Sequence, residues 1–151
     1  MEAPELLRDL VLGLDHVAIA VRDLGAARTL YEEGLGLVSA GQEHVPGQKV
    51  HVLMLMAGTQ RIELVQPSSD DSPITKFLAT RGEGIHHLAW RVGNLEACLE
   101  HLKARGVRLI HETAQAGAHG TRIAFVHPAS TGGVLMELVE VPPLDGSQST
   151  Q

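Results

Sequence analysis

Within residues 14–21, two polar positions follow Leu14, and an apolar run comes next in which β-branched residues alternate with alanines, a pattern that predicts a β-strand. Asp23 is a suitable N-cap, and the apolar residues that follow recur at helical spacing until Gly34, so a helix is expected next. Apolar and β-branched runs at 48–57 and 61–65 predict further strands. The first half of the chain therefore has the order strand, helix, strands.

The same order of elements returns in the second half of the chain. A strand is expected at 85–92, and Asn94 is placed to cap a helix that ends at Gly106. Strands near 122–126 and 134–139 complete this half. The repetition predicts two copies of one βαβββ module.

A linker helix is expected between the modules, with Ser72 as its cap and Pro73 at its first position. We therefore predict an α+β fold in which two tandem βαβββ modules form a cupped mixed sheet around a cleft. The predicted parts are an N-terminal extension (1–13), a first module (14–66), a linker helix (72–80), a second module (85–142) and a polar tail (143–151), with 14–142 as a single domain.

The composition is that of an ordinary globular protein, with 151 residues, 44% of them hydrophobic and 20% charged. The formal net charge of −6 argues against nucleic acid or an anionic membrane as the main partner. No apolar run approaches the roughly 20 residues of a membrane-spanning helix, and the charged residues within 1–13 are unlike a secretory signal. Cys98 is the only cysteine, so no intrachain disulfide can form, and we expect a cytoplasmic protein.

Four residues occupy equivalent places in the two modules. His16 and His87 lie in the first strands, 87 − 16 = 71 residues apart, and Glu63 and Glu137 lie in later strands, 137 − 63 = 74 apart. Each residue alone would be interpreted as an ordinary sheet residue, but the paired offsets favour a shared site with two imidazoles and two carboxylates. This set of nitrogen and oxygen ligands suits one divalent metal ion, with Co²⁺ preferred and Mn²⁺, Ni²⁺ or Zn²⁺ as alternatives.

Strand alternation predicts which way the histidines point. The apolar residues of both strands alternate on the face that packs under the helices, so His16 and His87 are expected on the opposite face. The same rule places Asp15 and His86 on the helix side. Of the adjacent histidines, His87 is therefore the expected ligand.

The remaining polar residues receive weaker assignments. Four of them are candidate substrate contacts, because they offer a cation, a glycine-rich loop or a hydroxyl: Lys76, His119, Gly120 and Ser130. The other notable side chains are expected to be structural or solvent-exposed, with His44, His101 and His111 at the surface, His51 in the sheet and Cys98 in the core.

Five segments carry recognisable motifs. They are Leu14-Asp-His-Val-Ala-Ile-Ala-Val21, Ser72-Pro-Ile-Thr-Lys-Phe-Leu78, Gly82-Glu-Gly-Ile-His-His87, Gly117-Ala-His-Gly120 and His127-Pro-Ala-Ser-Thr-Gly-Gly-Val-Leu-Met-Glu-Leu138. Together they resemble the methylmalonyl-CoA epimerase family of the vicinal oxygen chelate superfamily, which also contains glyoxalase I and extradiol dioxygenases. The resemblance covers roughly residues 14–142.

The resemblance implies a metal-dependent epimerase that interconverts (2R)- and (2S)-methylmalonyl-CoA. The implied metal ligands are His16, Glu63, His87 and Glu137. The implied reaction is abstraction and return of the α-proton through a metal-stabilised enolate, which needs one base on each face of the substrate. The implied partners are an acyl-CoA substrate and a second copy of the chain in a homodimer.

Three positions depart from patterns seen in that family. Glu63 stands where some members carry Gln, and Ala129 stands where a lysine often precedes the serine. Val52 stands where some members place a candidate base glutamate, and a valine cannot move a proton. Glu63 and Glu137 are therefore the expected catalytic residues, and the resemblance to glyoxalase I implies that either could loosen from the metal to accept a proton.

Three other functions use the same kind of sequence. A glyoxalase I-like isomerase acting on a glutathione hemithioacetal would have the same four ligand types. An iron dioxygenase needs two histidines and one carboxylate with more open positions, so it fits less well. A metal-free module that binds a small molecule would not need the complete His/Glu/His/Glu set.

Overall fold

The computed structural model describes residues 10–142, so residues 1–9 of the predicted extension and the predicted tail at 143–151 lie outside the described residues. The helices and strands follow in the order β1 (Val11–Ala20), α2 (Leu24–Arg28), β2 (Val38–Val45), β3 (Val50–Ala57), β4 (Gln60–Pro67), α3 (Pro73–Arg81), β5 (Gly84–Val92), α4 (Leu95–Ala104), β6 (Gln115–Ala116), β7 (Arg122–Val126) and β8 (Met136–Glu140).

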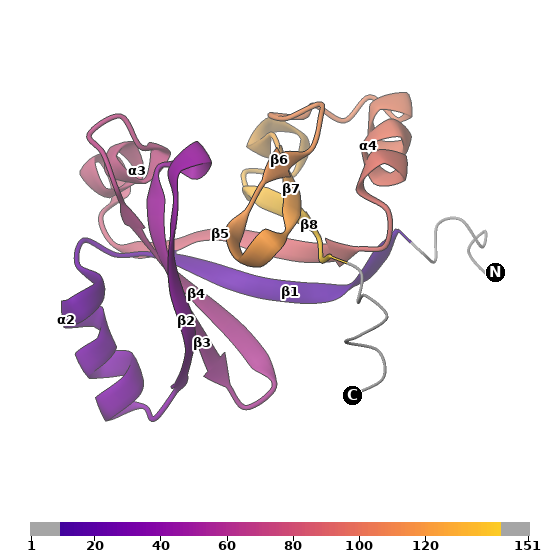
Figure 1. Ribbon diagram of the computed structural model, residues 1–151. Coiled ribbons are helices and arrows are strands. Elements are labelled where there is room, and N and C mark those ends of the chain that lie inside the picture. The colour runs from indigo at the N-terminus through magenta and orange to yellow at the C-terminus, as the bar shows by residue number, and fades with distance from the viewer. Residues whose placement is uncertain (1–9, 143–151) are drawn as a thin grey trace, which may run out of the picture.

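The strands of both modules form one continuous sheet with the order β2-β3-β4-β1-β5-β8-β7-β6. The pairs β1–β4 and β5–β8 are parallel, and the antiparallel pair β1–β5 joins the two halves at the centre. Figure 1 shows β1 and β5 running side by side, with β2, β3 and β4 toward one end of this pair and β6, β7 and β8 toward the other. The predicted α+β fold with a cupped mixed sheet is confirmed, as one sheet rather than two separate ones.

The helix caps form as expected from the sequence. The Asp23 side chain accepts hydrogen bonds from the first turn of α2, Asn94 accepts one from Ala97 N in α4, and Ser72 accepts one from Ile74 N in α3. The first helix differs from the prediction in its second half. It continues beyond α2 as a π-helical turn over Thr29–Gly34, which widens the helix before the chain enters β2.

The strands differ from the prediction most clearly at β1 and β2. β1 begins earlier than residue 14, at Val11, and β2 is a strand whose residues were not predicted. β2 is an edge strand with mostly exposed side chains and a register shift at Gly41, so it lacks the alternation that marks a half-buried strand.

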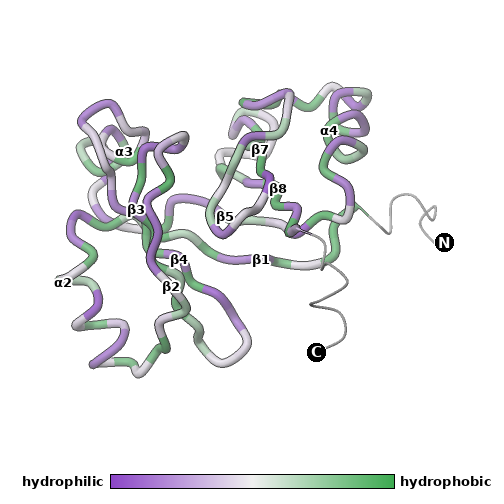
Figure 2. The backbone as a smooth tube through the Cα atoms, in the orientation of Figure 1, coloured by the Kyte–Doolittle hydropathy of each residue, from purple (hydrophilic) through white to green (hydrophobic). Residues whose placement is uncertain are grey.

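Separate apolar clusters pack on the two faces of the sheet. On the outer face, α2 covers a cluster that includes Leu53 and Leu64, and α4 covers one that includes Val92 and Leu138. The linker helix α3 instead packs by Ile74 and Leu78 against inner-face residues of the first module. Figure 2 shows hydrophobic and hydrophilic positions mixed along each helix, as expected for helices with one buried side.

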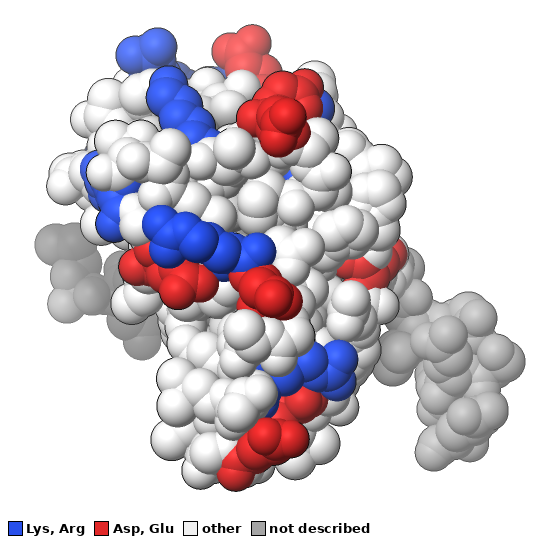
Figure 3. Space-filling view, turned by 90° about the vertical axis from the view of Figure 1, so that its left-hand side faces the viewer, with Lys and Arg blue, Asp and Glu red and all other residues white. Residues whose placement is uncertain are grey.

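The exposed charges on the face seen in Figure 3 are of both signs, with Lys and Arg side chains beside Asp and Glu side chains. That face therefore has no broad basic area of the kind that binds nucleic acid. Among the described residues, the helices are too short or too polar to cross a bilayer.

Leu53 tests the packing of the outer face, because it is fully buried on β3 beneath α2. We expect Leu53→Ala to lower the free energy of unfolding by about 2–5 kcal/mol through lost burial and the cavity left behind. Urea denaturation would measure the change. Leu35→Ala is the matched control, since Leu35 is 63% exposed and its truncation should change stability by less than about 0.5 kcal/mol.

Candidate metal centre

The two modules place their histidine and glutamate side chains by the same strand register. In the first module, Ala18 of β1 is paired with Glu63 of the parallel strand β4. In the second, Ala89 of β5 is paired with Glu137 of the parallel strand β8. Each alanine lies two residues beyond a histidine, so His16 and His87 face the same side of the sheet as the carboxylate of their own module.

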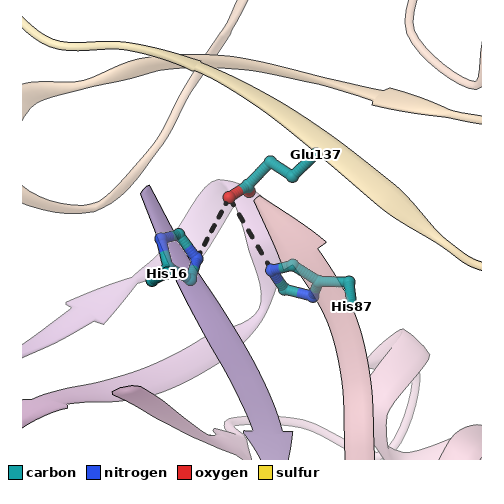
Figure 4. Close-up of side chains that lie close together, drawn as sticks. All are labelled: His16, His87 and Glu137. Atoms are coloured by element: carbon teal, nitrogen blue, oxygen red, sulfur yellow. Dashed lines mark ion pairs between the residues drawn. The ribbon is translucent and has the colours of Figure 1, made fainter. Parts of the chain in front are cut away.

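The four side chains meet at the centre of the sheet. His16 Nε2 lies 3.3 Å from Glu63 Oε2 and 3.3 Å from Glu137 Oε1, while His87 Nε2 lies 3.7 Å from the same oxygen of Glu137. Figure 4 shows the Glu137 carboxylate between the two imidazoles, which rise from β1 and β5. Ligand atoms of His16, His87 and Glu137 all lie within 4.8 Å of one another.

These side chains have the burial and the missing partners expected of a cation site. All four are buried, with 4–7% of each residue exposed. His16 Nε2 and His87 Nε2 have no hydrogen-bond partner, although buried polar atoms almost always have one. Two carboxylates and two free imidazole nitrogens in one buried place require a positive charge, so the residues fit a divalent metal ion.

The electrostatics of the site favour the same conclusion. Burial lowers the pKa of His16, but Asp15, Glu137 and Glu63 outweigh it and raise that pKa to about 10. Burial raises the pKa of Glu137, but the nearby imidazoles of His16 and His87 dominate and lower it to about 2. Burial raises the pKa of Glu63, and His16 opposes this only in part. His16 therefore holds a proton unless another cation takes its place among the carboxylates.

Two cavities open from the centre, and Glu63 and Glu137 line both of them. The first, of about 300 Å³, lies toward Arg61 and Pro142. The second, of about 330 Å³, lies beneath α3 and has a mainly apolar wall that includes Val52 and Phe125. The carboxylates thus face a space large enough for a small organic molecule.

Comparison with known proteins identifies the family. Residues 15–125 match the family model of the glyoxalase/bleomycin resistance protein/dioxygenase superfamily. A methylmalonyl-CoA epimerase from Mycobacterium tuberculosis has a crystal structure with a TM-score of 0.87 and 43% identity, over 95% of this chain and 94% of that one. The chain belongs to the methylmalonyl-CoA epimerase family of this superfamily.

Two other members of the epimerase family are informative. The ethylmalonyl-CoA/methylmalonyl-CoA epimerase of Cereibacter sphaeroides is 37% identical over 130 residues, which are 85% of this chain and 97% of that protein. A Streptomyces coelicolor methylmalonyl-CoA epimerase variant in complex with 2-nitronate-propionyl-CoA has a TM-score of 0.83 and 32% identity, over 88% of this chain and 99% of that one.

Val52, the position where some family members carry a glutamate, is buried on β3 and lines the second cavity. Its partner on β2 is Glu43, a carboxylate that the sequence analysis did not single out. Glu43 Oε2 accepts a hydrogen bond of 2.6 Å from His119 N. This bond ties the edge strand of the first module to the glycine-rich loop of the second, beside both cavities.

The candidate substrate contacts lie at different distances from the centre. His119 lines the first cavity, whereas Lys76 is exposed on α3 and Ser130 Oγ accepts a hydrogen bond from Arg108 N. Lys76, Gly120 and Ser130 are not on the walls of these two cavities. The substrate-contact role of all four residues stays a prediction.

Three residues lie elsewhere than the sequence indicated. His111 was expected at the surface but is half-buried, lines the second cavity and accepts a hydrogen bond from Phe125 N. Asp15 and His86 were expected under the helices but lie beside His16 and His87. Strand alternation fails for this pair because each sits in a β-bulge, which rotates its side chain out of the alternating pattern.

We expect His87→Ala to weaken Co²⁺ binding more than about 100-fold. Loss of a residue that only contacts a ligand weakens metal binding by about 10- to 100-fold, and His87 is itself a proposed ligand. The reason is that one nitrogen ligand is lost outright. Competition with a chromophoric chelator would measure the dissociation constant. His101→Ala is the control, since His101 lies on α4 away from both cavities, and a loss of affinity of equal size there would contradict the assignment.

Proposed function

We propose that this chain epimerises methylmalonyl-CoA at C2 in a metal-dependent reaction. The convergence of His16, Glu63, His87 and Glu137 in a buried centre supports this most strongly, because the two Nε2 atoms lack any other partner. Relatives named as epimerases of the same substrate class add support. The single, buried cysteine fits an enzyme of the reducing cytoplasm.

His16, His87, Glu63 and Glu137 would hold the metal ion. This mixed nitrogen and oxygen set suits a divalent ion of the first transition row, and we propose Co²⁺, with Mn²⁺, Ni²⁺ and Zn²⁺ as alternatives. When bound, such an ion would supply positive charge that polarises the oxygens of a 1,3-dicarbonyl substrate.

Glu63 and Glu137 are the groups that move the proton. They belong to β4 and β8, in corresponding places of the two modules on either side of the central pair β1–β5. One carboxylate takes the proton from C2, and the electron pair of that bond moves toward the thioester carbonyl. The other carboxyl group, in its protonated form, gives its proton to the opposite face as the electron pair returns to C2, which inverts this carbon.

The second cavity suits the acyl end of the substrate. Its wall beneath α3 is apolar, with Val50, Val65 and Ile74, and it ends at the two glutamates. A short alkyl group can therefore be buried while the polar malonyl oxygens face the ligand set. A free binding module without metal would leave the two imidazole nitrogens unexplained.

Hydrogen exchange in deuterated water tests the reaction. We expect the C2 hydrogen of methylmalonyl-CoA to exchange with inversion in the presence of Co²⁺ and not after chelation, as followed by NMR. Glu137→Gln should cut turnover by about 10²- to 10⁴-fold, because an amide cannot accept the proton. The same cut is expected for Glu63→Gln.

The outcomes separate the alternatives. Full activity of Glu63→Gln would exclude Glu63 as an essential base, but it would be compatible with Glu63 as a metal ligand. Metal-independent exchange would contradict the proposal as a whole. Turnover of a glutathione hemithioacetal, with none of methylmalonyl-CoA, would instead support a glyoxalase I-like isomerase.

The protein works as a homodimer in this proposal. The outer face of the central pair β1–β5 carries three apolar cross-strand pairs, Leu14–Trp90, Val17–Leu88 and Ile19–Ile85. Ile85 is 66% exposed and Leu14 is 44% exposed, which is costly for a face that stays in water. An antiparallel pair has local twofold symmetry, so a second copy can cover this face with the same residues.

We expect Ile85→Glu to shift the protein from a dimer to a monomer, because it places a charge in the covered face. Light scattering after size-exclusion chromatography would give the mass. Leu35→Glu is the control, since Leu35 is equally exposed but lies at the end of the π-helical turn. A monomeric unsubstituted protein at micromolar concentration would contradict the proposal.

A further inference from the structure

In each module, the residue immediately before the ligand histidine contacts the ring nitrogen that faces away from the site. Asp15 Oδ2 lies 2.7 Å from His16 Nδ1, and His86 Nδ1 lies 2.9 Å from His87 Nδ1. The free nitrogen of each ring, Nε2, is the one that lies near Glu137.

Both contacts depend on a β-bulge. From Leu14 to His16 on β1, the partner strand advances by only one residue, so Asp15 is the extra residue. From His87 to Ile85 on β5, β1 advances by only one residue, so His86 is the extra residue. Each bulge turns the extra side chain toward the histidine that follows it in the chain.

We propose that Asp15 and His86 are positioning residues that fix the tautomer of the two ligand histidines. A histidine that binds a metal through Nε2 carries its proton on Nδ1, and an acceptor at Nδ1 holds that tautomer and the ring orientation. Asp15 is such an acceptor for His16. For His87 the acceptor is Nδ1 of His86, so the proton of His86 is on its Nε2.

The two modules therefore orient their histidines with different chemistry. Asp15 is a buried carboxylate, and Arg61 and Arg91 approach its other oxygen at 3.2 and 3.3 Å. These arginines pair with Asp15, and a carboxylate acceptor at Nδ1 makes His16 the more strongly donating ligand. His86 is a ring that packs edge-on against Phe77 of α3, with centroids 4.9 Å apart. The linker helix α3 thus holds His86 in place, and through His86 it orients His87.

This inference rests on the metal site of the proposed function, but its test does not need turnover. Long-range ¹H–¹⁵N correlation spectra of the Zn²⁺-loaded protein report the protonated nitrogen of each histidine. We expect His16 and His87 to carry the proton on Nδ1 and His86 on Nε2. Ligation of His16 or His87 through Nδ1, or a proton on Nδ1 of His86, would overturn the proposal.

Graded variants test the contribution of each acceptor to metal affinity. Asp15→Asn keeps an acceptor oxygen but loses the charge, and we expect Co²⁺ binding to weaken about 10- to 100-fold, with Asp15→Ala weaker still. Asn places its carbonyl oxygen where His has Nδ1, so His86→Asn should retain most of the affinity that His86→Ala loses. Equal affinity of His86→Asn and His86→Ala, or an unchanged affinity of Asp15→Ala, would overturn the corresponding half of the proposal.

Matched controls exclude a general loss of structure. Asp70→Asn and His101→Asn change the same residue types away from both cavities and should leave Co²⁺ affinity unchanged. Thermal unfolding after chelation shows whether each variant still folds, and for any that does not, the spectra of the unsubstituted protein decide. Should these spectra show the expected tautomers while methylmalonyl-CoA does not exchange its C2 hydrogen, the proposed function fails and this inference stands.

Discussion

The central constraint on this structure is a group of buried charges: the carboxylates of Glu63, Glu137 and Asp15 surround His16 and need cations to compensate them. Carboxylates removed from water are costly unless cations compensate them. Arg61 and Arg91 compensate Asp15, but the pair of glutamates faces two imidazole nitrogens without hydrogen-bond partners. One divalent ion would satisfy all four groups at once, which is why we propose a metal centre at this site.

Duplication of a small module explains how a short chain builds such a centre. A parallel strand pair in each half sets a histidine and a glutamate on the same face, and the antiparallel pair β1–β5 brings the halves together. The helices pack away from the centre, two on the outer face and one above the cavity that ends at the glutamates. The candidate ligands therefore all lie on paired strands of one sheet, which favours a preorganised site.

Much of this arrangement could be predicted from the sequence, because it follows from periodicity and repetition. The equal places of His16 and His87, and of Glu63 and Glu137, indicated a shared site where single residues would not. The roles of Asp15 and His86 could not be predicted, because a bulge depends on the pairing of two distant strands and leaves no mark in the alternation of one. β2 was missed for a related reason, since an exposed edge strand need not alternate.

The same reasoning explains why candidate ligands could be named from the sequence while most of the surroundings of the site could not. A ligand set is defined by a few residue types at repeated positions, whereas a cavity wall is assembled from many elements. His111 and Glu43 reach the cleft region from loops and an edge strand that meet only in the folded chain. The contact of Glu43 with His119 joins segments 76 residues apart in the chain, which no local pattern encodes.

Anomalous diffraction at the cobalt edge, from crystals of the Co²⁺-loaded protein, tests the central claim most directly. The account predicts a single strong peak per chain within bonding distance, about 2.0–2.3 Å, of Nε2 of His16, Nε2 of His87 and one oxygen each of Glu63 and Glu137. A peak elsewhere, or one that excludes either module's pair of side chains, would contradict it.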